Sequence, residues 1–192
     1  MSKTKFPSEA ALIVCRELLA DLCGATERVA IAGSLRRKKP LVGDIELLFI
    51  PRIAQLPARD LFGHDIPTRN LAEEAIADWL ARGVLKKRIN VNGSEMWGEK
   101  NKLAVHVSTG IPVDLFAATE ANWFNYLVCR TGPSESNIRI ASAAQRKGWM
   151  WHPYGEGFSR GSGLGRERIA VTSEREVFEF VGLPYLEPEK RT

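Results

Sequence analysis

The chain has 192 residues, with 27 lysines and arginines against 23 aspartates and glutamates, and a formal net charge of +4. Hydrophobic residues make up 44 % and charged residues 26 %, which is typical of a soluble globular protein and excludes a wholly disordered chain. The longest apolar run, Ala10 to Cys15, is far shorter than the ~20 residues of a membrane span, and the N-terminus has no secretory signal pattern. Three cysteines without a Cys-x-x-Cys motif indicate reduced thiols, so we expect a cytoplasmic protein that is neither secreted nor membrane-bound.

Residues 1–118 are predicted to form one domain of strands and covering helices. Apolar residues at helical spacing predict a leading helix over 8–23, which ends at Gly24. Short strands are predicted at 28–32 and 44–50, followed by a helix over 68–82 and strands at 84–91, 103–108 and 113–116. This order predicts an α/β (α+β) fold in which helices cover a mixed β-sheet.

Residues 119–192 are predicted to form a smaller lobe that is rich in helices. Two helices, over 120–130 and 134–147, are separated by Thr131-Gly132-Pro133. We interpret the Gly-rich stretch 155–165 as a flexible loop, which precedes a short strand at 168–171. Ser173-Glu174-Arg175-Glu176 has the capping-box pattern and predicts the start of a last helix that ends at Gly182.

A glycine-serine turn after the first predicted strand could bind phosphate. The backbone N–H groups of Gly33 and Ser34 favour an anion, especially with a helix N-terminus behind them. Arg37 or Arg36, further along the same turn, could hold the same phosphates with a charged fork. The turn by itself is a weak signal, since such pairs are common in proteins.

Three carboxylates follow this turn in an order that suggests a metal site. Asp44 and Glu46 are two residues apart on a predicted strand, so their side chains should project from the same face. Asp114 is an isolated acid in the apolar stretch Ile111 to Phe116. Carboxylates that share a face repel each other, and a divalent cation relieves the repulsion. Beside a phosphate-binding turn, they could hold two Mg²⁺ ions for phosphoryl or nucleotidyl transfer.

In order and spacing, these motifs resemble the palm of the nucleotidyltransferase superfamily, and in detail the family X DNA polymerases. The resemblance extends to the segment from Val177 to Arg191, which is similar to the family's C-terminal thumb motif. It implies a minimal palm (1–118) with a thumb-like subdomain (119–192). The catalytic and metal-binding residues that it implies are Asp44, Glu46 and Asp114, with two Mg²⁺ ions or Mn²⁺ in their place. The nucleotide-binding residues that it implies are Gly33, Ser34, Arg37, Gly43, Gly132 and Asn137.

The resemblance also implies a function and partners. A family X polymerase adds deoxynucleotides to a primer 3′-hydroxyl in gap filling and repair, by two-metal nucleotidyl transfer. The partners implied are a nucleoside triphosphate and primer/template or gapped DNA, with the protein as a monomer. The small size suggests a bacterial, phage-encoded or viral setting, and we expect no N-terminal lyase domain. We interpret four basic residues as contacts to a nucleic-acid backbone: Lys100, Lys102, Arg146 and Lys147.

Departures from the family pattern leave two alternatives open. Cys129-Arg130 replaces an aromatic pair that helps to exclude ribonucleotides, and Ile138 stands where templated members place a basic residue. The first difference concerns discrimination of the sugar. The missing basic residue and the expected lack of an N-terminal DNA-anchoring domain favour a template-independent terminal nucleotidyltransferase that acts on nucleic-acid ends or on another acceptor. Glu46, which replaces the usual aspartate, is the argument for a catalytically silent relative that only binds nucleic acid.

Overall fold

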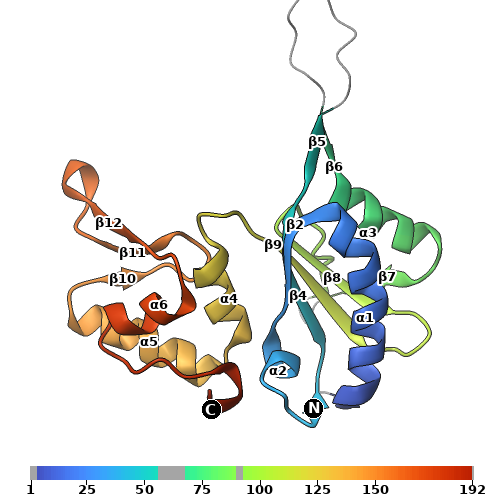
Figure 1. The fold of residues 1–192 in the computed structure, drawn as a ribbon, viewed down its shortest axis with the longest axis horizontal. Coiled ribbons are helices and arrows are strands. Elements are labelled where there is room, and N and C mark those ends of the chain that lie inside the picture. Colours follow the sequence, from blue (N-terminus) through green and yellow to red (C-terminus); the bar gives the residue numbers. More distant parts are fainter. Residues whose placement is uncertain (1–3, 56–67, 90–92, 192) are drawn as a thin grey trace, which may run out of the picture.

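The computed structural model describes residues 4–55, 68–89 and 93–191, which form two lobes (Figure 1). The first lobe contains a five-stranded sheet in the order β2-β4-β9-β8-β7. Strands β4 and β9 are parallel and the other neighbours are antiparallel, so the predicted mixed sheet is confirmed. The five strands are β2 (Thr26–Ile31), β4 (Ile45–Pro51), β7 (Leu85–Lys87), β8 (Asn101–His106) and β9 (Pro112–Ala117).

Helices α1 (Ser8–Ala25) and α3 (Leu71–Ala81) pack on one face of this sheet, and the short helix α2 (Gly33–Arg36) follows β2 (Figure 1). The predicted helix over 68–82 starts late, because Asn70 Oδ1 caps α3 by accepting a hydrogen bond from the Glu73 N–H at 3.1 Å. Two small ribbons pair β1 (Phe6–Pro7) with β3 (Leu41–Val42), and β5 (Ile53–Gln55) with β6 (Thr68–Asn70). The predicted strand 84–91 corresponds to β7, and its last two residues lie outside the described ranges.

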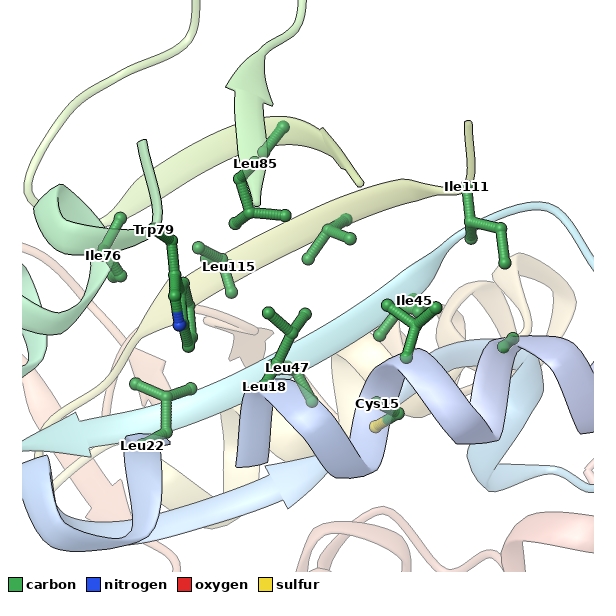
Figure 2. Close-up of a cluster of buried hydrophobic side chains, with 14 of the residues drawn as sticks. Cys15, Leu18, Leu22, Ile45, Leu47, Ile76, Trp79, Leu85, Ile111 and Leu115 are labelled. Atoms are coloured by element: carbon green, nitrogen blue, oxygen red, sulfur yellow. The ribbon is translucent and has the colours of Figure 1, made fainter. Parts of the chain in front are cut away.

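Alternation along β4 and β9 places the core on the α1 side of the sheet. Ile45, Leu47 and Leu115 are at most 1 % exposed and pack against Leu18 and Trp79 of the two helices (Figure 2). Since side chains along a strand alternate between faces, Glu46 and Asp114 lie on the opposite face. The burial of the apolar side chains thus determines where the acidic ones emerge.

The second lobe contains three helices and a small sheet. It consists of α4 (Trp123–Thr131), α5 (Ser134–Arg146), β10 (Met150–Trp151), β11 (Gly157–Arg160), β12 (Glu167–Ala170) and α6 (Glu174–Phe180), with 3-10 turns at Gly163–Gly165 and Pro188–Lys190. The apolar side of α4 covers the second face of the large sheet through Trp123, Tyr126 and Leu127. Within the described residues, no helix combines the length and the apolar character that crossing a membrane requires.

The interpretation of residues 155–165 as a flexible loop was wrong for its central part. Strand β11 occupies 157–160 and pairs with both β10 and β12. Gly157, at φ 152°, lets the two strands approach closely, since a Cβ there would lie 2.1 Å from the Ile169 carbonyl oxygen. The glycine therefore marks a tight strand pairing.

A buried carboxylate joins the lobes. Glu174, 9 % exposed, accepts hydrogen bonds from the guanidinium groups of Arg36 in the first lobe and Arg191 near the C-terminus. Arg36 also donates to Thr131 Oγ1 at 2.6 Å, at the end of α4. The preceding residue, Ser173, caps α6 by accepting from the Glu176 N–H at 3.1 Å, as the capping-box pattern predicted.

Replacing Leu47 by alanine is expected to lower the free energy of unfolding by about 2–5 kcal/mol, because the cavity would open between β4 and α1. The measurement is urea denaturation followed by circular dichroism. Leu41→Ala is the matched control, since Leu41 is 53 % exposed and its truncation should change stability by less than about 0.5 kcal/mol. Equal losses in the two variants would contradict the assigned core.

Candidate active site

The parallel pairing of β4 and β9 brings two of the predicted carboxylates together. Glu46 and Asp114 are direct register partners on the face that α4 covers. Asp44 immediately precedes β4, so it does not lie on the strand as predicted, although it lines the same cleft as Glu46. Glu46 and Asp114 thus come from two adjacent strands, and Asp44 comes from the residue just before β4.

A cleft of about 530 Å³ lies between the two lobes and collects most of the predicted nucleotide-binding residues. From the first lobe it is lined by Ser34, Arg37, Gly43, Asp44 and Glu46. From the second lobe it is lined by Cys129, Arg130, Gly132, Ser134, Asn137 and Tyr154. Residues about 100 positions apart therefore form one concave site, as the order of the motifs predicted.

Gly33 lies against the Glu46 carboxylate and needs to be a glycine. Its φ is +63°, and a Cβ there would lie 1.9 Å from Glu46 Oε2. Arg37 reaches from the same turn across the cleft and donates to the Thr131 carbonyl oxygen. Asn137 donates to the Cys129 carbonyl oxygen at 2.8 Å, which fixes the amide at the opposite wall.

The Glu46 carboxyl group has an unusually high pKa. Burial, together with the negative charges of Asp44 and then Asp114, raises its pKa from 4.5 to about 8. Arg130 and Arg37 act in the opposite direction and offset only part of this effect. The same burial lowers the pKa of Arg37. At neutral pH and without a metal, the Glu46 carboxyl group is therefore mostly protonated.

Asp114 is held by an arginine that the sequence analysis did not identify. Arg88 Nη2, just beyond β7, donates to Asp114 Oδ1 at 2.5 Å, and both side chains are largely buried. In the described residues, no three His, Cys, Asp or Glu side chains converge closely enough to ligate a metal ion. The oxygen donors of Asp44 and Glu46 are of the type that Mg²⁺ prefers, and a bound cation would favour the charged form of Glu46. The third carboxylate, Asp114, is paired with Arg88 instead.

Two further residues at the cleft come from distant parts of the chain. Lys5 approaches Gly43, and Tyr154 comes from the loop between β10 and β11. Arg130 stacks over the Phe116 ring at 3.6 Å from the ring centroid and 5.2 Å from that of Tyr154. No motif marked Lys5 or Tyr154, because only tertiary packing brings them to the site.

The structure separates the four predicted nucleic-acid contacts. Lys100 is exposed and lines a second cleft of about 890 Å³, which shares Arg130 and Tyr154 with the first. Lys102 is 3 % exposed, and its ammonium group donates to Glu73 and to the Gly98 carbonyl oxygen, so it is not available to a phosphate. The alternation of β8 turns it inward. In the second lobe, the Lys147 ammonium donates to the Phe180 carbonyl oxygen at 3.0 Å, and Arg146 is exposed.

The raised pKa of Glu46 predicts a pH-dependent stability in the absence of metal. Between pH 4.5 and about 8 the folded protein retains a proton that the unfolded chain loses, so the free energy of unfolding should fall as the pH rises. The loss should reach a few kcal/mol, at about 1.4 kcal/mol per pKa unit, and Glu46→Gln should remove it. Urea titrations in EDTA between pH 5 and 8 measure the effect. Parallel curves for the two proteins would contradict the assignment.

Comparison with known proteins supports the same architecture. Residues 126–192 match the family model of the DNA polymerase beta thumb. Among solved structures, the chain is similar to Leishmania infantum polymerase beta in a ternary P/T complex, with a TM-score of 0.70 and 21 % sequence identity over 98 % of this chain and 77 % of that one. No curated protein matches the chain in sequence. The C-terminal lobe therefore matches the polymerase beta thumb, and the chain as a whole has a fold similar to that of polymerase beta.

Proposed function

We propose that the protein is a nucleotidyltransferase of the family X type, which adds deoxynucleotides to a primer 3′-hydroxyl on gapped or recessed DNA. The observation that carries the proposal is the single cleft in which Ser34 and Arg37 of one lobe face Gly132 and Asn137 of the other, above Asp44 and Glu46. The polymerase beta-like fold and the thumb match support it.

The residues of the cleft divide into two groups by charge. Ser34, Arg37 and the backbone N–H groups of the turn at Gly33 suit the triphosphate, because they offer hydrogen-bond donors and positive charge. Asn137 and Gly132 form the wall against which the sugar and base would lie. The carboxylates lie on the floor, where a primer hydroxyl would meet the α-phosphate for in-line attack.

Asp44, Glu46 and Asp114 are proposed to hold two Mg²⁺ ions. These ions supply charge stabilisation for the reacting oxygens and for the pyrophosphate leaving group. Asp44 and Glu46 already share the cleft, and Asp114 joins them once its carboxylate turns from Arg88. Asp114 then accepts or orients the proton of the attacking hydroxyl.

A template-independent terminal transferase is the second candidate. Ile138 of α5 is 63 % exposed, so this helix presents an apolar surface where a duplex-reading helix needs basic side chains. Cys129 and Arg130, rather than an aromatic pair, line the sugar side of the cleft. Both features favour weak reading of the template and of the sugar.

Extension of a labelled primer distinguishes these candidates. The primer is offered single-stranded, recessed on a template and across a one-nucleotide gap, with Mg²⁺ or Mn²⁺ and one nucleotide at a time. Incorporation that follows the template base, strongest at the gap, is expected for the first candidate. Addition on every substrate regardless of template identifies a terminal transferase. Absence of incorporation, with nucleic acid still bound, would overturn both and leave a silent binding protein.

Asp114→Asn is expected to reduce incorporation by about 10²–10³-fold or more, because the amide cannot replace a carboxylate as a metal ligand or proton acceptor. The fold should persist, since the amide oxygen can still accept the hydrogen bond from Arg88. Asp78→Asn, on the exposed side of α3 where Asp78 pairs with Arg82, is the matched control and should leave incorporation unchanged. Full activity of Asp114→Asn in a stably folded protein would refute the role assigned to this carboxylate.

A further inference from the structure

The second lobe contains a pocket of its own, of about 400 Å³, between the loop after β10 and the β11–β12 hairpin. We call it the hairpin pocket and define it by His152, Ser159, Arg166 and Arg168. Apolar groups of Phe158 and of the end of β12 complete its walls. None of its four defining residues belongs to the cleft between the lobes.

Three polar groups converge inside the hairpin pocket. Arg166 Nη2 donates to Ser159 Oγ at 3.1 Å and lies 3.3 Å from His152 Nε2. The Ser159 hydroxyl lies 2.7 Å from the same imidazole nitrogen and is 4 % exposed, so the strand fixes its position. The guanidinium, hydroxyl and imidazole groups therefore lie next to one another, and all three are groups that commonly donate hydrogen bonds to phosphate oxygens.

The charge of the hairpin pocket is positive and poorly compensated. Along the same hairpin, Arg160 pairs with Glu167 at 2.8 Å. By contrast, no carboxylate of the described residues forms an ion pair with Arg166 or Arg168, and Glu156 lines the pocket without pairing to either. Burial and the charges of these two arginines lower the pKa of His152, which agrees with a positive field at this point.

The hairpin pocket is rigidly connected to the cleft between the lobes. Asn125 of α4 is fully buried, donates to the Gly155 carbonyl oxygen at 3.0 Å and accepts from Trp151 Nε1 at 2.6 Å. These bonds hold the loop that carries Tyr154, which lines the hairpin pocket and both clefts. A strand bound in the clefts would therefore contact a loop that also lines the hairpin pocket.

We propose that the hairpin pocket binds a phosphate group of the nucleic acid, held by Arg166 and Arg168 with Ser159 and His152 as hydrogen-bonding partners. The proposal rests on the proposed function, because nucleic acid is the phosphate source that the clefts would bring to this lobe. The phosphate is either an internal diester of the backbone or the terminal 5′-phosphate of a downstream strand. Both present the same anionic oxygens to the guanidinium groups.

The test is fluorescence anisotropy of the full chain with one-nucleotide-gapped DNA at several salt concentrations. Arg166→Gln/Arg168→Gln should weaken binding several-fold and reduce the slope of log K against log[salt] by about 1, because one phosphate contact is lost. Arg160→Gln is the matched control, because Arg160 lies on the same hairpin but is already paired with Glu167. Thermal unfolding establishes that all variants are folded.

Repeating the titration with a downstream strand that carries a 5′-hydroxyl separates the two phosphate sources. If the effect of the double variant disappears, the ligand is the terminal phosphate, and if it persists, the ligand is an internal diester. A double variant that binds like Arg160→Gln would overturn the proposal while leaving incorporation, and hence the proposed function, intact. If the wild-type chain bound no nucleic acid, the proposed function would fail. The phosphate site would fail with it if inorganic phosphate also left the His152 imidazole resonances unchanged. A shift of these resonances in wild type and not in the double variant would support the phosphate site alone.

Discussion

The pairing of Glu174 with Arg36 and Arg191 is the interaction on which the arrangement of the site depends. A buried carboxylate is costly unless its oxygens are paired, and here two guanidinium groups from opposite parts of the chain compensate it. Arg36 belongs to the turn that also carries Ser34 and Arg37, and its bond to Thr131 reaches the start of the Gly132 segment. The same contact thus joins the lobes and fixes the position of the turn with Ser34 and Arg37 relative to the segment at Gly132, which are the two walls of the cleft.

At the floor of the cleft, in contrast to Glu174, the buried carboxyl group of Glu46 is only partly compensated by arginines. Glu46 has two acidic neighbours and only partial compensation from arginines, so its proton is retained up to about pH 8. The ionised form of Glu46 is therefore poorly stabilised by the protein, and a bound cation is the simplest means of stabilising it. Arg88 provides such compensation to Asp114 in the described conformation. Glu46 and Asp114 therefore differ in charge compensation, although they are direct neighbours on β4 and β9: Asp114 is paired with an arginine, and Glu46 is only partly compensated.

The hairpin pocket extends the same principle to the second lobe. Arg160 and Glu167 neutralise each other on the hairpin, while Arg166 and Arg168 line the pocket without a carboxylate partner among the described residues. Arg166 also donates to the buried Ser159 hydroxyl. Such unevenly distributed positive charge creates a local site for an anion that the net charge of the chain does not reveal. Tyr154 connects this pocket to the clefts and is a residue that no sequence motif marked.

Local patterns were sufficient to predict a mixed sheet and its main helices, whereas most residues of the cleft were implied by the family resemblance. The capping box at Ser173, the apolar run of β4 and the glycine-serine turn each depend on residues close together in the sequence, so their structures follow from it. The late start of α3 and the pairing of β11 escaped prediction, because a side-chain cap and a partner strand override local propensity. The burial of Lys102 was missed for a similar reason, since the phase of β8 relative to its neighbours turns the side chain inward.

The sequence by itself determined the class of fold and the order of the glycine-serine turn and the three carboxylates along the chain. Only the tertiary structure decided which residues meet across the lobes. Lys5, Arg88, Arg130 and Tyr154 reach the site from four separate segments. Their positions depend on long-range packing and on the compensation of buried charge, which arise only when distant segments are brought together.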